Sequence, residues 1–284
     1  MEIVVGKLAG FCPGVENAVN GAEKSLEQNG KVYCLGELVH NGQVVKSLES
    51  KGMITVENLE EIPDNSKVIF RAHGVPKKIY EEAEKKNLEI FDLTCPKVKS
   101  IHSKVEKYIG KAFIIIVGKK NHPEVIGTAG FAGDNFYIIE NEDDILDSYM
   151  EYEKTCLGLV YVVAQTTFSS EKFDYLAEEI EKNFYEADCV IDKTICMTTE
   201  NRQAEVRSIA QTVNSMIIIG GKNSSNTKEL YNIAKENCGK LFLIENVCEL
   251  NDVEFDKNEK IGIMAGASTP LENIEEVVKY LERI

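Results

Sequence analysis

The sequence predicts an α/β fold in which three similar subdomains, each built from parallel strands and flanking helices, follow one another along the chain. Strand-like and helix-like segments alternate throughout. The strand-like segments are unbroken apolar runs such as AFIIIVG and SMIIIGG, which is typical of parallel strands buried on both faces. One pattern of residues also occurs three times, and such internal repetition indicates three copies of one structural unit.

Each copy of the pattern begins with a cysteine, followed by a helical stretch, an apolar strand that ends in glycine, and a polar turn. The cysteines are Cys12, Cys95 and Cys196, and the glycines that close the strands are Gly36, Gly118 and Gly220. The polar residues that follow each glycine at the same distance are His40, His122 and Ser224. The near-identical spacing supports a true repeat.

The second half of each copy contains a further strand, an acidic segment and a strand that ends in a turn of small residues. These strand ends read VIFRAHGVP, VYVVAQTTFS and IGIMAGASTP, and we align His73, Thr166 and Ser268, each of which follows an alanine-containing turn. Helical stretches are expected next, over residues 77–87, 170–183 and 271–284, and short strands over 88–94 and 189–195. We therefore predict subdomains over 1–95, 96–195 and 196–284, packed as one compact body.

The repeat predicts a shared binding site, because open parallel sheets bind ligands at the carboxyl ends of their strands. Packing about a pseudo-threefold axis would bring six polar turns and the three cysteines to one cavity. Three thiolates with one open position suit a catalytic zinc ion or an iron–sulfur cluster. The turns supply hydrogen-bond donors that suit phosphate, and they carry His40, His73, His122, Thr166, Ser224, Ser225, Asn226 and Ser268.

Simpler interpretations exist for each of these residues. The chain has 8 cysteines, none in C-x-x-C spacing, and free cysteines are commonly small buried hydrophobes. The KNSSN and HPE segments also suit ordinary helix starts. The shared repeat position is what favours a site for Cys12, Cys95 and Cys196. His102 lies inside a helix, away from the repeat positions, and is assigned no site role.

Composition excludes several classes of partner. The chain has 32 Lys and Arg against 47 Asp and Glu, a formal net charge of −15, which argues against nucleic acid and anionic membranes as main partners. No apolar run approaches the ~18 residues of a spanning helix, and no secretion signal begins the chain, so we expect a cytoplasmic protein. No G-x-G-x-x-G or P-loop motif is present, so no flavin or nicotinamide of its own is expected.

The motifs FCPGV, ELVHN, FRAHGVP, DLTCP, GKKNHPEV, AQTT, TICxxTxNRQ, KNSSNT and GASTP, in this order, resemble the 4-hydroxy-3-methylbut-2-enyl diphosphate reductase family. The resemblance runs from Cys12 to the end of the chain. It implies a trefoil of three α/β domains around a 4Fe-4S cluster with three cysteine ligands and one open iron site. It also implies reductive dehydroxylation of the allylic diphosphate to isopentenyl and dimethylallyl diphosphate, the last step of the methylerythritol phosphate pathway. A ferredoxin or flavodoxin would be the external electron donor.

The resemblance also implies roles for individual residues. The cluster ligands would be Cys12, Cys95 and Cys196, Glu124 the proton donor and Thr166 the hydroxyl that relays the proton. The substrate contacts would be His40, His73, His122, Thr166, Thr199, Ser224, Ser225, Asn226 and Ser268. Two other functions stay open from the residues alone: a zinc-dependent hydrolase or lyase, and a non-catalytic protein that binds a phosphorylated metabolite.

Overall fold

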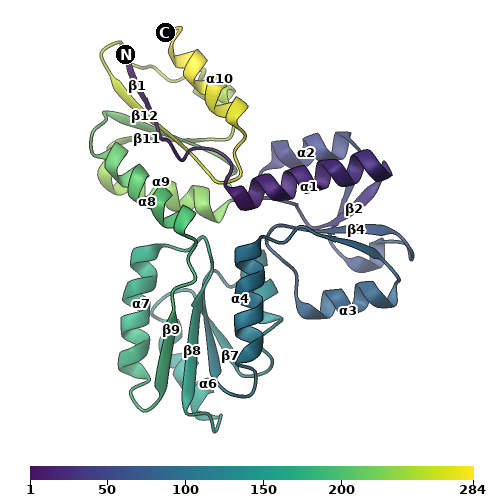
Figure 1. The fold of residues 1–284 in the computed structure, drawn as a ribbon. Helices are drawn as coiled ribbons and strands as arrows, with labels where there is room; N and C mark the ends of the chain where they lie inside the picture. Colours follow the sequence, from purple (N-terminus) through teal and green to yellow (C-terminus); the bar gives the residue numbers. More distant parts are fainter. The chain divides into compact units, whose positions relative to one another are not determined.

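The computed structural model describes residues 1–284 and contains three four-stranded sheets (Figure 1). All neighbouring strands pair in parallel. Read in one direction, the strand orders are β3-β2-β4-β5, β7-β6-β8-β9 and β11-β10-β12-β1. The predicted parallel α/β fold with three similar sheets is therefore confirmed.

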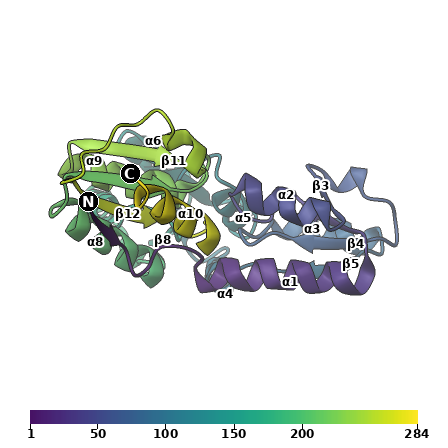
Figure 2. The ribbon, with the colours of Figure 1, turned by 90° about the horizontal axis from the view of Figure 1, so that it is seen from above.

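The first sheet contains β2 (Val32–Leu35), β3 (Met53–Val56), β4 (Lys67–Phe70) and β5 (Glu89–Asp92). Its helical elements are α1 (Pro13–Asn29), α2 (Gly42–Ser50), η1 (Leu59–Glu61) and α3 (Lys77–Lys85). Helix α1 runs alongside this sheet (Figure 2). On the face toward α3, Val68 and Phe70 of β4 pack with Leu59 and Ala83, so β4 is held by residues shortly before and after it in the sequence.

The second sheet contains β6 (Phe113–Val117), β7 (Phe136–Ile139), β8 (Leu159–Ala164) and β9 (Asp188–Asp192). Its helices are α4 (Pro96–Lys107), α5 (Pro123–Ala129), α6 (Asp144–Glu153) and α7 (Ser170–Asn183). Ile115 of β6 packs toward α7 beside Phe173, whereas its neighbour Ile114 packs toward α4 beside Val105. Alternate residues thus face opposite layers, which explains why this strand is apolar at every position.

The third sheet joins the two ends of the chain. It contains β1 (Glu2–Val5), β10 (Ser215–Ile219), β11 (Lys240–Ile244) and β12 (Lys260–Ala265). Its helical elements are α8 (Met197–Ala210), α9 (Ser225–Asn237), η2 (Val247–Leu250) and α10 (Leu271–Leu281). Strand β1 pairs with β12, from Glu2 beside Lys260 to Val5 beside Ile263. The first strand therefore lies with the C-terminal residues, unlike in the predicted grouping 1–95.

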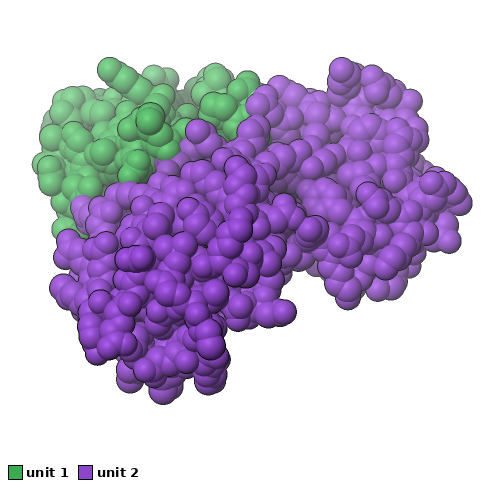
Figure 3. Space-filling model, turned by 60° about the horizontal axis from the view of Figure 1, so that its bottom comes forward, with its two compact units in different colours: residues 1–16, 39–47, 197–284 green, residues 17–38, 48–196 purple.

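The chain divides into two compact units, which Figure 3 colours separately. The C-terminal unit comprises residues 1–16, 39–47 and 197–284 and contains the third sheet. The central unit comprises residues 17–38 and 48–196 and contains the first and second sheets.

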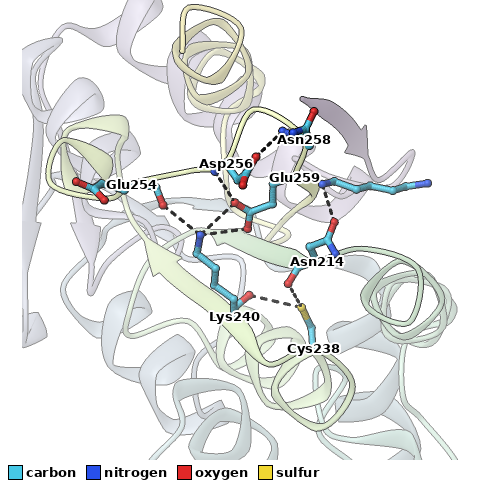
Figure 4. Close-up of polar contacts among 8 residues, drawn as sticks. Asn214, Cys238, Lys240, Glu254, Asp256, Asn258 and Glu259 are labelled. Atoms are coloured by element: carbon cyan, nitrogen blue, oxygen red, sulfur yellow. Dashed lines mark hydrogen bonds and ion pairs between the residues drawn. The ribbon is translucent and has the colours of Figure 1, made fainter.

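Polar contacts around Lys240 fasten the amino ends of strands in the third sheet (Figure 4). The Lys240 ammonium lies 3.1 Å from the carboxylate of Glu259, which is only 8% exposed, and donates to the Glu254 carbonyl at 3.1 Å. The Asn214 side chain accepts from the Lys260 N–H at 2.8 Å. Because these contacts lie at the sheet edge opposite the polar turns, they stabilise the unit rather than form part of a site.

Candidate functional site

The polar turns stand at the carboxyl ends of the two central strands of each sheet. In chain order, the residues beyond β2, β4, β6, β8, β10 and β12 are His40, His73, His122, Thr166, Ser224 and Ser268. This edge is where parallel α/β sheets bind ligands. The central unit carries His73, His122 and Thr166, and the C-terminal unit carries His40, Ser224 and Ser268.

The three repeat cysteines occupy equivalent positions, each between the fourth strand of a sheet and the helix that follows. Each cysteine N–H donates to the carbonyl of the second residue beyond the neighbouring strand: Cys95 to Ala72 at 2.9 Å, Cys196 to Thr166 at 3.0 Å, and Cys12 to Ala267 at 3.1 Å. The backbone thus fixes all three cysteines in the same way against a polar turn.

These hydrogen bonds correct the alignment of the turns. Thr166 is equivalent to Ala72 and Ala267, whereas the sequence alignment paired it with His73 and Ser268, one residue further on. The alignment rested on alanines in the turns. Equivalence is set instead by the register of each strand with its neighbour, and turn composition does not follow that register.

The sulfur contacts of Cys12 differ from those of two buried cysteines, Cys34 and Cys238. Cys12 Sγ accepts a hydrogen bond from the Val15 N–H at 3.5 Å. Cys34 Sγ–H instead donates to the Gly36 carbonyl at 3.2 Å, and burial raises the pKa of the Cys34 thiol to about 12. Cys238 likewise donates its S–H to backbone carbonyls. A buried thiol such as Cys34 therefore makes a poor metal ligand.

The repeat cysteines are half-buried, so their sulfur atoms are neither sealed in a core nor fully exposed. Cys12 belongs to the C-terminal unit, and Cys95 and Cys196 belong to the central unit. No group of three or more His, Cys, Asp or Glu side chains is gathered closely enough to hold a metal ion. The donor type itself, the cysteine sulfur of three half-buried residues, suits a thiolate-bound cluster.

Glu124 and Thr166 form a buried acid–hydroxyl pair in the central unit. The Glu124 carboxylate accepts from the Thr166 N–H at 2.6 Å and from the Thr166 hydroxyl at 2.8 Å. Glu124 is only 3% exposed. Burial raises the pKa of Glu124 to about 7, although the hydrogen bonds from Thr166 act in the opposite direction. The pair can therefore hold or release a proton near neutral pH.

His122 is oriented by the first turn of α5. Its Nδ1 accepts a hydrogen bond from the Glu124 N–H at 3.1 Å. In its neutral form the ring therefore carries its proton on Nε2, which can donate to a ligand. The His73 ring meets the His122 ring edge-to-face, with 5.6 Å between centroids, so two predicted substrate contacts from different sheets lie together.

In the C-terminal unit, the turn after β12 binds the turn that carries His40. The Ser268 hydroxyl donates to the His40 carbonyl at 3.0 Å. A Cβ on Gly221 would lie 2.6 Å from the same carbonyl oxygen, so only glycine permits this approach. The structure thus brings together three of the predicted turns of this unit.

The first turn of α9 presents polar side chains where the helix dipole favours an anion. The Ser224 hydroxyl accepts from the Thr227 N–H at 3.3 Å, so Ser224 caps the helix. Ser225 is buried beside it. Asn226 is 3% exposed, and its side-chain nitrogen has no hydrogen-bond partner in the protein. A buried donor without a partner is costly unless a ligand accepts from it.

Thr199 is buried on α8 in the C-terminal unit. One turn later, the guanidinium of Arg202 donates to two backbone carbonyls. The TICxxTxNRQ motif includes Arg202, but the sequence assigned it no role, because main-chain partners leave no trace in the sequence.

His102 also lies closer to the predicted site than its place in a helix suggested. Its ring stacks on Phe131, with centroids 4.3 Å apart. A Cβ added to Gly74 would lie 2.7 Å from the His102 ring, and one added to Gly127 would lie 3.6 Å from Nε2. Gly74 follows His73 directly. His102 therefore packs beneath the segments that carry His73 and His122.

Comparisons with known proteins agree on one family. The family model described as LytB protein matches residues 3–282. The chain is 39% identical to the 4-hydroxy-3-methylbut-2-enyl diphosphate reductase of Caldanaerobacter subterraneus subsp. tengcongensis, covering 100% of this chain and 98% of that protein.

Solved structures support the same relationship. The E-1-hydroxy-2-methyl-but-2-enyl-4-diphosphate reductase of Plasmodium falciparum is 31% identical with a TM-score of 0.88, covering 99% of this chain and 87% of that one. A structure described as (E)-4-hydroxy-3-methyl-but-2-enyl diphosphate reductase, the terminal enzyme of the non-mevalonate pathway, is 39% identical with a TM-score of 0.72 and full coverage of both chains.

None of the helices combines the length and the apolar character that a membrane-spanning segment requires.

Proposed function

The chain belongs to the LytB protein family, and from that membership we propose how its residues carry out the reaction of this family. The reaction is the reductive dehydroxylation of (E)-4-hydroxy-3-methylbut-2-enyl diphosphate to isopentenyl diphosphate and dimethylallyl diphosphate, the terminal step of the non-mevalonate, or methylerythritol phosphate, pathway. The similarity extends over the full length of the chain, so it includes every residue discussed below.

Cys12, Cys95 and Cys196 are proposed to hold a 4Fe-4S cluster with one iron free of protein ligands. Their equivalent backbone hydrogen bonds and half-buried sulfurs support this assignment. When bound, such a cluster supplies electrons one at a time and a Lewis-acidic iron for the substrate hydroxyl. The role of the protein is to offer three thiolates and leave the remaining position open.

The diphosphate group is proposed to bind at the first turn of α9 and the neighbouring turns. Asn226 has a buried donor ready for an acceptor, and the N-terminus of α9 favours negative charge. Ser225, Ser268 and His40 would supply further hydrogen bonds. His73 and His122 are assigned to the same ligand, with the Nε2 proton of His122 facing it. This anchor would orient the hydroxyl for reaction, with Thr199 beside the carbon chain.

Glu124 is proposed to supply the proton with which the hydroxyl leaves as water, and this is the assignment on which the mechanism depends. The single observation that carries it is the hydrogen bond of 2.8 Å between the Glu124 carboxyl and the Thr166 hydroxyl. When Glu124 is protonated, it can donate along this contact, while the Thr166 hydroxyl passes its own proton to the substrate oxygen. The carbon skeleton takes up two electrons and a second proton, which balances the reaction.

The electrons are proposed to come from a ferredoxin or flavodoxin, and the enzyme to work in the cytoplasm. The chain contains neither a G-x-G-x-x-G motif nor a P-loop, so the sequence offers no nucleotide-binding segment for a bound reductant.

The experiment that tests this assignment is anaerobic purification followed by iron and sulfide analysis and a reductase assay with a chemically reduced viologen. We expect a brown protein with four irons and four sulfides per chain that converts the allylic diphosphate to both products. A colourless protein that contains zinc would contradict the cluster and favour a zinc enzyme. Diphosphate binding that survives replacement of all three cysteines, together with no turnover in the unaltered protein, would indicate a binding protein instead.

A further inference from the structure

A buried arginine of the C-terminal unit links the loop that carries Cys12 to the turn that carries Ser268. Arg202 lies on α8 and is only 2% exposed. Removing a guanidinium from water is costly unless its N–H groups find acceptors. The acceptors of the Arg202 guanidinium therefore indicate which backbone segments this side chain connects.

Two of the acceptors are backbone carbonyls at the carboxyl edge of the third sheet. Arg202 Nη2 donates to the Gly10 carbonyl at 2.7 Å, and Nη1 donates to the Ala265 carbonyl at 3.3 Å. Gly10 lies just before Cys12 and has a φ of 103°, a conformation that favours glycine. Ala265 ends β12, just before the turn with Ser268. One guanidinium thus contacts both segments.

A separate hydrogen bond joins the same two segments. The Cys12 N–H donates to the Ala267 carbonyl at 3.1 Å. Beyond it, the Ser268 hydroxyl donates to the His40 carbonyl at 3.0 Å. The hydrogen bonds of Arg202 and Cys12 therefore both hold the turn that follows β12. The Ser268 hydrogen bond connects this turn to the segment with His40.

Helix α8 itself carries a third group. Thr199 precedes Arg202 by one helical turn, so both side chains project from the same side of α8, and both are buried. Arg202 consequently connects three elements that carry a proposed cluster ligand, a proposed diphosphate contact and a proposed substrate-side threonine.

We infer that Arg202 is a positioning residue, which fixes the Cys12 thiolate relative to the Ser268 hydroxyl and thereby the reacting hydroxyl relative to the cluster. This inference rests on the proposed function. Arginine suits the role because its rigid fork donates to two carbonyls at once, whereas a lysine ammonium is a point donor on a flexible stem. Displacements of about 1 Å at a reacting group can cost roughly a hundred-fold in rate.

The test compares the anaerobically purified protein with the variants Arg202→Lys and Arg202→Met. Arg207→Met, which removes a partly exposed arginine from the same helix, is the matched control. The measurements are iron and sulfide per chain, the cluster's electron paramagnetic resonance spectrum with and without substrate, affinity for inorganic diphosphate, and kcat per intact cluster.

For Arg202→Lys we expect a retained cluster and affinity for inorganic diphosphate within about two-fold of the unaltered protein, which is under ~0.5 kcal/mol. We expect kcat per cluster to fall roughly ten-fold or more, and the spectral change caused by substrate to differ. We expect Arg202→Met to lower kcat per cluster further than Arg202→Lys does. If the methionine variant fails to fold, the lysine variant decides.

A purely structural arginine would lower thermal stability and cluster content but leave kcat per intact cluster and the substrate-induced spectrum unchanged. That result in Arg202→Lys overturns the inference. Equal loss in Arg207→Met also overturns it. Absence of iron or of turnover in the unaltered protein contradicts the proposed function itself, whereas an active unaltered protein with equally active Arg202 variants contradicts only the role of Arg202.

Discussion

The carboxyl group of Glu124 and the hydroxyl of Thr166 lie 2.8 Å apart in the interior of the central unit. The same carboxyl also accepts the backbone N–H of Thr166 at 2.6 Å, so the side chain is held at both oxygens. Because Glu124 is held in this way, its environment rather than its mobility determines when it carries a proton. The position of Thr166 in the fold therefore influences whether Glu124 carries a proton.

The first prediction concerns the pH dependence of turnover. Burial raises the pKa of Glu124 to about 7, so the carboxyl is mostly protonated below that pH and loses its proton above it. If the protonated form is the donor, kcat should decline as the pH rises through about 7. Glu124→Gln should lower kcat by roughly a hundred-fold or more and abolish this decline, as measured at saturating substrate across pH 6 to 9.

Glu84 is an exposed glutamate on α3, and Glu84→Gln serves as the control for this variant. It should keep both the kcat and the pH profile of the unaltered protein. Cluster content has to be verified in each protein. Near-normal turnover in Glu124→Gln with an intact cluster would remove Glu124 from the mechanism.

The second prediction separates the cysteines. Replacing Cys12, Cys95 or Cys196 singly by Ser should abolish normal cluster content, because each occupies the same backbone position beside a polar turn. Cys34→Ser and Cys248→Ser should retain it, since Cys34 is a buried thiol with a pKa raised to about 12 and Cys248 is exposed elsewhere. Iron and sulfide analysis decides, and normal content in Cys95→Ser would refute the ligand assignment.

The third prediction concerns the diphosphate anchor. Asn226→Ala and His73→Ala should each weaken binding of a diphosphate ligand by roughly ten-fold or more, since a hydrogen bond to a charged group contributes about 1.5–3 kcal/mol. Calorimetric titration measures this. Asn237→Ala, at the far end of α9, is the matched control because its side chain contacts only the Ile233 carbonyl and the Gln211 side chain, away from the polar turns. Unchanged affinity in both test variants would exclude this anchor.

The fourth prediction concerns His102. Burial lowers the pKa of His102 to about 4, below its ordinary value near 6.5, so the unfolded chain takes up this proton more readily than the folded one. Its contribution to stability is therefore complete above pH 6.5 and declines as the pH falls toward 4. The difference corresponds to about 3 kcal/mol.

Thermal midpoints measured from pH 7.5 down to 5 should therefore fall less steeply in His102→Gln than in the unaltered protein. Glu124 acts in the opposite sense, since its raised pKa stabilises the fold most at low pH and loses that effect through about pH 7. Glu124→Gln measures that opposing contribution. If the thermal midpoint depends on pH identically in His102→Gln and the unaltered protein, the pKa of His102 does not differ between the folded and unfolded states.

Much of the fold could be predicted from the sequence because its signals are local. Apolar runs mark the buried strands, and the spacing from each cysteine to each glycine marks the repeat. The exception is β1, a four-residue strand whose sequence, EIVV, contains nothing that identifies its partner. A short edge strand pairs according to tertiary context, so the sequence analysis placed it with its neighbours along the chain.

The candidate site shows the same division. Residue types and spacing identified the polar turns and the cysteines, but the equivalence of Thr166 with Ala72 depends on strand register. Arg202 and His102 received no role from the sequence for a related reason. Arg202 donates to the main-chain carbonyls of Gly10 and Ala265, and His102 packs against Gly74 and Gly127. Such partners become visible only when the chain is folded.

The pairing of β1 with β12 has a consequence for biosynthesis. A ribosome makes Glu2 first and its partner Lys260 near the end, and domains generally fold as their residues emerge. The first strand must therefore remain unpaired through most of translation, together with the Cys12 N–H, whose acceptor Ala267 is made later still. The Cys12 N–H therefore finds its acceptor only after Ala267 has been made, and a translation product interrupted earlier lacks this contact at the proposed cluster ligand.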